Sequence, residues 1–351
     1  MAQAMGVRVD SRRRRTLKAV EGSKKAVYVA LAGNMAIAAA KFTAAWFTGS
    51  SAMLSEGAHS LVDCGNEVLL LYGMKRAARP PDLDHQFGHG REVYFWSFVV
   101  ALLFFALGAG VSFYEGVQHL LNPHEIEYYS VTYGVLLVSM LCEGISLRVA
   151  AKEFAKQKGD LGYVEAIRRS KNPATFTILL EDSAALLGLS VAFLGILGAQ
   201  LLHMPALDGV ASLGISLILG TMAVFLAVET KGLLLGEQAS PVLEAEVLRA
   251  ASEDPAVQMA NGVYTVHIGP DQIVAALSVE FARSADAAEI ERAVERIEAT
   301  ICAERPEVLM LFVKPQSHAT WQERLAEIEA ASTPELRALA LRRRAVWRKL
   351  G

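Results

Sequence analysis

A histidine and an aspartate stand four residues apart inside an otherwise apolar segment. His59 and Asp63 lie in "SSAMLSEGAHSLVDCGNEVLLLYG", which is apolar enough to cross a bilayer. Residues i and i+4 share one face of a helix, so both groups point the same way, and Glu67 roughly continues the row. Ionisable groups inside a membrane are expensive and usually functional. An imidazole nitrogen beside carboxylate oxygens is a reasonable ligand set for a divalent metal.

A second acidic pair, Glu181 and Asp182, interrupts the apolar segment "PATFTILLEDSAALLG". At 1.5 Å per residue, Asp63 lies ~16 Å from one membrane face and Asp182 ~13 Å from the other. The hydrocarbon is ~30 Å thick, so His59, Asp63 and Asp182 can meet near the midplane. A single helical histidine is more often a packing residue, but the two aspartates favour a metal ligand. Glu181 points ~100° away from Asp182 and is left open as ligand, proton carrier or ion-pair partner.

A connecting segment, "ARPPDLDHQFGHGREVYFW", holds another group of metal-binding residue types. Asp82, His85 and His89 follow one another at spacings of three and four, and Gly88 permits a tight turn. Two imidazoles and a carboxylate within ten residues indicate a metal site. The alternative is a polar turn in which Asp84 and His85 cap the following helix.

Long apolar segments must position these groups. The chain has 351 residues and is 53% hydrophobic, with the apolar runs concentrated in residues 27–232. A membrane helix needs ~20 mostly apolar residues. The sequence predicts six such helices, at about 27–47, 52–73, 93–118, 128–150, 173–199 and 206–232.

The charges of the connections predict an orientation. Lys and Arg gather before the first span and in the second and fourth loops, whereas the other three connections have none. Positive charge in short loops marks the cytoplasmic side, so both termini are expected in the cytoplasm, with a bacterial inner membrane as the expected location. Lys41 in the first span is expected to extend outward to the interface. For Glu143 in the fourth span, a proton-carrying or structural role is left open.

The remaining sequence predicts a small α+β domain of order αββαβ. A helix over 240–253 is expected to start at the cap Ser240, and a later helix has Asp286 as its cap. His267 is expected on the surface of a strand. The predicted parts are a basic segment at 1–25, a six-helix membrane domain at 26–236, this α+β domain at 237–318 and a helical basic tail at 319–351. The tail is expected to be solvated or to lie on the membrane surface.

The order of the motifs resembles the cation diffusion facilitator family of divalent-metal/proton antiporters. The matching stretches are "TGSSAMLSEGAHSLVD", "HQFGHGRE", "LEDSAALLGL", "ALDGVASLGISL" and "ETKGLLLGE". The wording "LLEDSAALLG" is most similar to the branch related to zinc transporter nine. The resemblance implies a six-helix membrane domain, a ferredoxin-like cytoplasmic domain that forms homodimers, and metal transport coupled to protons.

The resemblance also implies particular ligands. The family's transport site falls on His59, Asp63 and Asp182, and its loop site on Asp82, His85 and His89. The family usually has a His or Asp four residues before the last carboxylate, where this chain has Ile178. The fourth ligand would then be Glu181, a water or a backbone carbonyl. The metal-binding positions of the cytoplasmic domain are largely replaced here, by Ser278, Phe312 and Lys314, leaving His267 and His318 as imidazoles.

These observations predict a proton-coupled transporter that moves a divalent cation out of the cytoplasm. The expected cargo is zinc, with manganese, iron or cobalt as alternatives, and no other cofactor is expected. The alternative is a non-transporting metal sensor or scaffold in the membrane. An enzyme is not expected, because the chain has no nucleophile elbow, phosphate-binding glycine loop or zincin motif. The expected partners are metal ions, protons, the lipid bilayer and a second copy of the chain, without nucleic acid.

Overall fold

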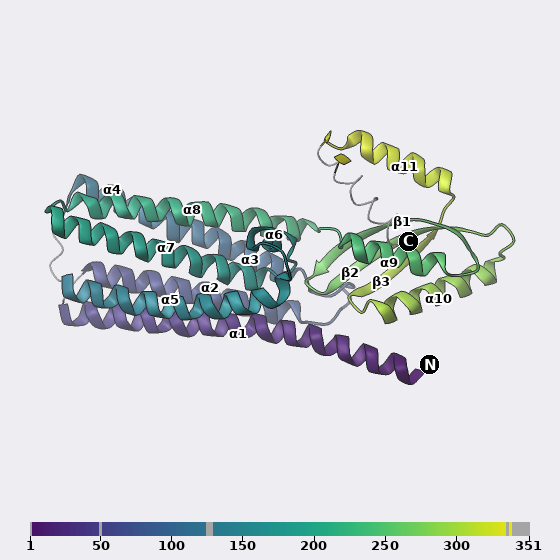
Figure 1. Ribbon diagram of the computed structural model, residues 1–351, viewed down its shortest axis with the longest axis horizontal. Helices are drawn as coiled ribbons and strands as arrows, with labels where there is room; N and C mark the ends of the chain where they lie inside the picture. The colour runs from purple at the N-terminus through teal and green to yellow at the C-terminus, as the bar shows by residue number, and fades with distance from the viewer. Residues whose placement is uncertain (1, 49–50, 124–128, 335–336, 339–351) are drawn as a thin grey trace. The chain divides into compact units, whose positions relative to one another are not determined.

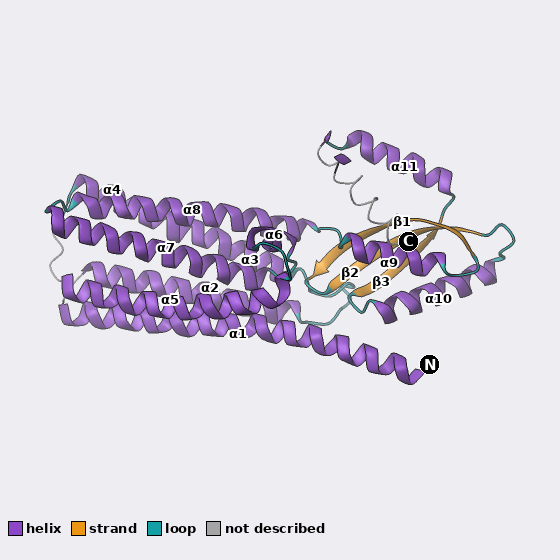
Figure 2. Cartoon of the chain, in the orientation of Figure 1, coloured by secondary structure: helices purple, strands orange, loops and turns teal. Residues whose placement is uncertain are grey.

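The computed structural model describes residues 2–48, 51–123, 129–334 and 337–338, and the side chains of these except 2–22, 48, 51–56, 58 and 59. The chain forms two compact units, one of Lys18–Leu234 and one of Met1–Leu17 with Leu235–Gly351. The first unit is helical, and the second contains a sheet (Figure 2).

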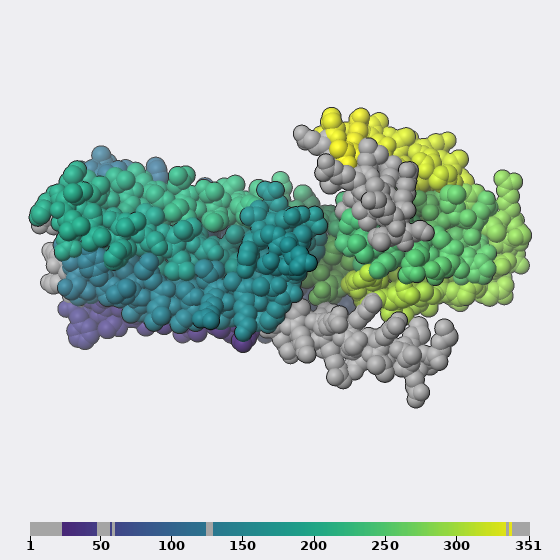
Figure 3. Space-filling model, viewed as in Figure 1, coloured from purple at the N-terminus to yellow at the C-terminus, as the bar shows by residue number. Residues whose placement is uncertain are grey.

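The helical unit consists of long helices that run side by side (Figure 1). They are α1 (Ala2–Thr48), α2 (Ser51–Ala77), α3 (Glu92–Leu103), the π-helix η1 (Phe104–Ala109), α4 (Gly110–Leu121), α5 (Tyr129–Lys158), α6 (Tyr163–Arg169), α7 (Pro173–Leu202) and α8 (Ala206–Leu235). The side chains of α5, α7 and α8 form a closely packed surface on the face drawn in Figure 3.

Within the part of the chain that the structure describes, five helical segments are long and apolar enough to cross a membrane. They are Ser23–Phe47, Glu92–Leu121, Tyr129–Lys158, Pro173–Leu202 and Ala206–Leu235. They agree with five of the six predicted spans. The sixth prediction, 52–73, falls in α2, where several side chains lie outside the described residues. A sixth span therefore stays a prediction.

An apolar core joins α1, α2, α3, α5, α7 and α8 at one end of the bundle. Its largest fully buried side chains include Tyr94, Phe154 and Phe176. Ile178, the position where a ligand was expected in the family pattern, is 1% exposed and belongs to this core. In a membrane, close van der Waals packing of such side chains holds the helices together, and this packing fixes the helices that carry the polar groups.

The second unit has the predicted order of helix, two strands, helix and strand. Its elements are α9 (Pro241–Ser252), β1 (Val257–Gly269), β2 (Gln272–Phe281), α10 (Ala287–Glu304), β3 (Val308–Pro315) and α11 (His318–Ala331). The sheet has the order β1-β2-β3, antiparallel between β1 and β2 and parallel between β2 and β3. Both predicted caps are confirmed, since Ser240 accepts from the Leu243 amide and Asp286 from the Glu289 amide.

One expectation for this unit was wrong. His267 is only 6% exposed, because its strand is covered and its Nδ1 lies 3.3 Å from the Gly269 carbonyl oxygen. Most described side chains of α11 are exposed, but the helix is anchored to the sheet because Trp321 is buried against Tyr264 of β1. A Cβ at Gly262 would lie 2.2 Å from the Trp321 ring, so this docking requires glycine there.

An ion pair between Asp254 and Arg296 links the end of α9 to α10. Arg296 donates from Nε and Nη2 to the two carboxylate oxygens, at 2.8 and 2.9 Å. The hydrogen bonds from Arg296 lower the pKa of Asp254 below its usual value. A lowered folded-state pKa stabilises the fold above the unfolded-state pKa of ~3.9, and this stabilisation is lost as the pH falls through the folded value.

We therefore expect Arg296→Met to destabilise this unit at pH 7 and to have a smaller effect at a pH below the lowered pKa of Asp254. Urea unfolding of the full-length protein, followed by hydrogen exchange of the α10 amides, measures the difference. Arg292→Met, one turn away on the same helix, is the control. A destabilisation that is equal at both pH values would contradict an ionic origin.

Candidate metal centres

The segment between α2 and α3 folds around the carboxylate of Asp82. Its Oδ1 accepts hydrogen bonds from the backbone amides of Asp84 and His85, at 3.0 and 2.7 Å. The carbonyl of His85 accepts from the amide of Gly88, which has a φ of +80° that favours glycine. These local hydrogen bonds turn the chain back on itself, and the turn brings His89 to the same aspartate.

The two imidazoles converge on that carboxylate. His89 Nε2 lies 2.9 Å from Asp82 Oδ2, and His85 Nδ1 lies 3.3 Å from Asp82 Oδ1. The two imidazole rings lie with their centroids 4.3 Å apart. The hydrogen bonds from His89 and the His85 amide lower the pKa of Asp82 to about 2, so its carboxylate is charged at neutral pH. One ligand atom from each of the three side chains falls within 4.8 Å of the others.

The ends of this segment are held by packing between α2 and α3. Arg76 donates from Nε and Nη2 to Glu92, at 2.9 and 2.7 Å, and the Trp96 indole donates to the other oxygen of Glu92 at 2.8 Å. A Cβ at Gly73 would lie 2.7 Å from the Trp96 side chain, so glycine permits this approach. The loop group is thus fixed by the helices on both sides.

The structure therefore brings Asp82, His85 and His89 together, whether or not a metal binds there. The alternative interpretation, in which Asp84 and His85 cap the next helix, is wrong. Helix α3 begins at Glu92, and its N-cap position is Arg91, several residues further along. The side chain of His89 is 6% exposed, whereas that of His85 is 58% exposed, so a cation could approach from the His85 side.

The second candidate centre lies inside the bundle, where α2, α5 and α7 carry acidic side chains. Asp182 and Glu181 are buried on α7, and Asp63 is partly buried on α2. His59 lies in α2, but its side chain is outside the described residues. Among the described side chains, Asp63, Glu181 and Asp182 do not form a group of ligand atoms within 4.8 Å of one another. The carboxylates share a region of the bundle without forming a closed metal shell.

Two buried amides hold two of the carboxylates. Asn34 of α1 donates to Glu67 Oε1 at 2.7 Å, and Asn66 of α2 donates to Glu181 Oε1 at 3.1 Å. Glu67 is 1% exposed and Glu181 8% exposed. Because α2 and α7 run in opposite directions, Glu67 and Glu181 both lie closer than Asp63 and Asp182 to the bundle end that carries the loop group. We call this pair with its amides the inner polar cluster.

The inner polar cluster and the neighbouring Asp182 together have more acceptors than donors. Four buried oxygens have no hydrogen-bond partner within the described part of the chain: Asn66 Oδ1, Glu67 Oε2, Glu181 Oε2 and Asp182 Oδ2. Leaving a buried acceptor unpaired costs about 1–3 kcal/mol, and more for a charged group. The arrangement is therefore suited to a cation or to protons, which supply the missing positive partners.

Several of these polar residues were not assigned by sequence reasoning. Asn34 and Asn66 gave no motif signal, although Asn66 is one turn from Asp63 on the same helix. Glu143 of α5 is 9% exposed and is an electrostatic neighbour of Asp63 and Asp182. The expectation that Lys41 extends outward is wrong. Its side chain is 8% exposed and donates to Ser60 at 2.9 Å, because the bundle interior offers it polar partners.

The described residues of the second unit offer no comparable group of ligands. Ser278 is buried and hydrogen-bonds Asn261 and Gln316, and His318 Nδ1 lies 3.0 Å from Asn261 Oδ1. Among its described residues, no three His, Cys, Asp or Glu side chains present ligand atoms within 4.8 Å of one another. The polar groups of this sheet instead hold α11 in place.

Comparison with known proteins gives clear matches. The family model described as "Cation efflux transmembrane domain" matches residues 27–235. The mitochondrial proton-coupled zinc antiporter SLC30A9 of Homo sapiens is 33% identical over 264 residues, which cover 74% of this chain and 46% of the relative. Metal tolerance protein C4 of Arabidopsis thaliana is 30% identical over 264 residues, covering 74% of this chain and 57% of that protein. The chain spans about half the length of these relatives.

A more distant relative is similar over most of its own length. Magnetosome protein MamM of Magnetospirillum gryphiswaldense is 24% identical over 256 residues, which cover 71% of this chain and 74% of that protein. The matched family region contains both candidate centres.

We expect the double change His85→Gln with His89→Gln to remove one zinc-binding site per chain. The imidazole nitrogens supply two of the three ligands, so affinity at the loop should fall on the order of tenfold or more. Isothermal titration calorimetry on the full-length protein in detergent measures this. His119→Gln, which alters a histidine paired with Asp208 instead, is the control. An unchanged stoichiometry and affinity in the double variant would rule out the loop as a metal site.

Proposed function

Because the chain belongs to the cation efflux family, also called the cation diffusion facilitator family, we propose that it is a proton-coupled antiporter that moves a divalent metal out of the cytoplasm. The resemblance read from the sequence motifs is thus confirmed at the level of the family. SLC30A9 is named as a zinc antiporter, which supports zinc as the cargo. The relatives are named as transporters or metal-tolerance proteins, and none of the names cited is that of an enzyme.

The observation that carries this proposal is the surplus of buried acceptor oxygens inside the bundle. Glu67, Glu181 and Asp182 each have an oxygen that no described residue satisfies. A dication bound by carboxylates displaces their protons, and its departure lets protons return. The same side chains can therefore hold metal in one state and protons in the other, which is the exchange that antiport requires.

We propose that His59, Asp63 and Asp182 hold the metal near the middle of the membrane. Helices α2 and α7 both carry acidic side chains into one region of the bundle, which supports this assignment. Both aspartates also interact electrostatically with Glu143, which agrees with it. Ile178 occupies the position of the usual fourth ligand and is packed in the core, so Glu181, a water or a carbonyl would complete the shell. For Glu181 to do so, its carboxylate would use the oxygen that Asn66 does not engage.

The inner polar cluster then lies between this centre and the loop group. In the proposed orientation, with both termini in the cytoplasm, the loop group faces the cytoplasm. The inner polar cluster is the next group of acidic side chains along the bundle from that side. A metal captured by Asp82, His85 and His89 could pass Glu67 and Glu181 before it reaches Asp63 and Asp182. The loop group is accessory in this scheme, because the buried carboxylates alone supply the transport site.

We further propose the finer architecture that the family pattern implies. Helix α2, with 27 residues and the acidic row, would be the sixth span. The order αββαβ supports a ferredoxin-like cytoplasmic domain that joins two copies of the chain. The domain boundaries at 26–236, 237–318 and 319–351 are proposed with it. A bacterial inner membrane remains a prediction, and manganese, iron and cobalt remain alternatives to zinc.

A non-transporting sensor is the second candidate, favoured by the apolar Ile178 at a ligand position. The two functions differ in one measurement. In sealed vesicles with an imposed proton gradient, a transporter accumulates zinc above its external concentration, whereas a sensor binds a fixed amount that the gradient does not change.

We expect Asp63→Asn and Asp182→Asn each to slow zinc-driven proton release at least tenfold, because each removes one of the proposed charged ligands of the metal. The measurement is the fluorescence of a pH dye inside proteoliposomes. Asp208→Asn is the matched control, since that aspartate pairs with His119 and belongs to neither centre. Normal proton release in both variants would overturn the midplane assignment.

Glu67→Gln tests whether the inner polar cluster lies on the pathway. The amide can still accept from Asn34, so the fold should survive, but the charge that attracts a cation is gone. We expect zinc transport to fall about tenfold while zinc binding at the loop is unchanged. Transport at the wild-type rate would show that Glu67 only supports the packing of α1 against α2.

Ile178→His tests the basis of metal preference. Oxygen-rich ligand sets tolerate manganese and iron, whereas imidazole favours zinc. With His59 as the single imidazole, the wild type should carry manganese, and the variant should gain preference for zinc in a competition assay. If the ratio does not change, or if the wild type already excludes manganese as strongly as the variant, Ile178 has no influence on selectivity.

A further inference from the structure

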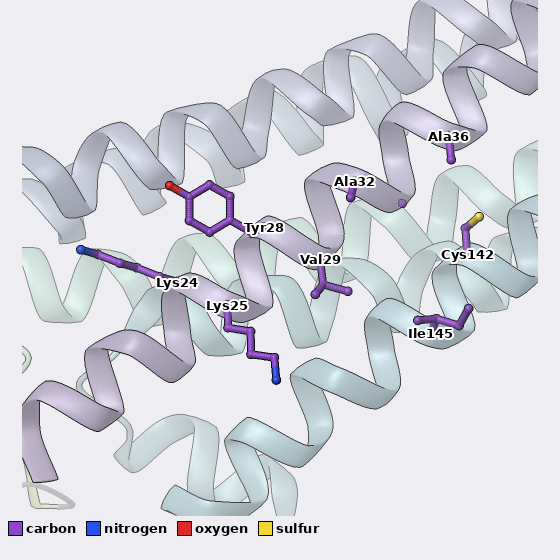
Figure 4. Close-up of a pocket in the computed structure, with 9 residues that line it drawn as sticks. Lys24, Lys25, Tyr28, Val29, Ala32, Ala36, Cys142 and Ile145 are labelled. Carbon is purple, nitrogen blue, oxygen red and sulfur yellow. The ribbon is translucent and has the colours of Figure 1, made fainter.

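A groove of about 650 Å³ opens on the helical unit between α1 and α5. Its floor is formed by Val29, Ala32 and Ala36 of α1 and by Cys142 and Ile145 of α5 (Figure 4). All of these side chains are small or apolar. The groove exists because alanine and glycine follow one another along this face of α1, so that nothing fills the space between the two helices.

The two helices nonetheless come close at the base of the groove. A Cβ at Gly33 would lie 3.8 Å from the Cys142 carbonyl oxygen and 3.9 Å from its Cβ, which is ordinary van der Waals contact. Tyr28 and Ile145, which also line the groove, have 59% and 53% of their surfaces exposed. The result is a shallow apolar channel with a closed floor and an open side.

Positive charge gathers at one end of this channel. Lys24 and Lys25 of α1 line that end, and Figure 4 shows both extending away from the apolar floor. On α5, Arg148 and Lys152 follow Ile145 by three and seven residues, which places them on the same helix face and toward the same end. Counting 1.5 Å per residue from the Gly33–Cys142 contact, Lys24 lies ~14 Å along α1 and Lys152 ~15 Å along α5. By the same count Lys25 lies ~12 Å and Arg148 ~9 Å from that contact, so all four cations are on the same side of it and Lys24, Lys25 and Lys152 are at similar levels.

We infer that this groove is a binding site for an anionic phospholipid, with an acyl chain along the apolar floor and the phosphate between the cations of α1 and α5. The distance from Lys25 to Ala36 is ~16 Å, about half the ~30 Å hydrocarbon thickness, which is the depth of one leaflet. Basic pockets between membrane helices recognise acidic lipid headgroups in this way. A partner helix would need carboxylates placed at that one end, whereas an acidic lipid combines an anionic headgroup and an apolar chain in one molecule.

Lipid at this position would act on α1 from outside the bundle. On its buried side, the same helix carries Asn34, which donates a hydrogen bond to Glu67, and Lys41, which donates one to Ser60. A bound lipid would fill the open side between α1 and α5 and hold α1 in the place from which it makes these bonds. The inference itself concerns binding and does not depend on which metal the protein moves.

The test is native mass spectrometry of the full-length protein in detergent, titrated with phosphatidylglycerol or with phosphatidylcholine of the same acyl chains. We expect phosphatidylglycerol to bind at least tenfold more tightly. Lys24→Gln with Lys25→Gln should remove most of this preference, and Ala32→Trp, which fills the exposed groove, should weaken both lipids. Lys75→Gln with Lys231→Gln, two exposed lysines on α2 and α8, is the charge-matched control.

Three outcomes would overturn the inference. If the control pair reduces binding as much as Lys24→Gln with Lys25→Gln, total charge and not this site governs it. If Ala32→Trp binds phosphatidylglycerol normally while its circular dichroism matches the wild type, no chain occupies the groove. If glycerol phosphate without acyl chains competes as well as the intact lipid, the lysines form a simple phosphate site instead.

Discussion

Buried carboxylates in an apolar helical bundle are the constraint on which the rest of this structure depends. A carboxylate in hydrocarbon is unfavourable unless a donor or a cation accompanies it. The bundle supplies amide donors from Asn34 and Asn66 and still leaves acceptor oxygens without partners. Protons or a bound cation would supply the missing partners, which agrees with the proposed exchange of metal for protons.

The same constraint explains how the helices are arranged. Helix α1 turns Asn34 and Lys41 inward, where they meet Glu67 and Ser60 of α2. Its opposite side carries alanine and glycine, and the groove toward α5 follows from that division. Polar contacts thus attach α1 to the acidic region from one side, while its small residues leave the other side open for an apolar occupant.

The two candidate centres differ in how their residues are brought together. Asp82, His85 and His89 lie within eight positions of the chain, so hydrogen bonds from the loop's own backbone shape most of the site. The membrane residues come from helices more than a hundred positions apart, and only the packing of the core sets their separation. Such a site can change its geometry when helices shift, whereas the loop group is fixed by the Arg76–Glu92–Trp96 contacts.

The sequence by itself determined the apolar segments, the helix and strand order of the second unit, its caps and the spacing of the loop group. Each of these depends on neighbours within a few residues, where periodicity and capping chemistry act. Tertiary structure alone decided that Lys41 points inward, that His267 is buried, that Trp321 docks on Gly262, and that Asn34 and Asn66 engage Glu67 and Glu181. The physical reason is that a side chain's partner across the bundle or sheet is fixed by packing between distant segments, which no local pattern encodes.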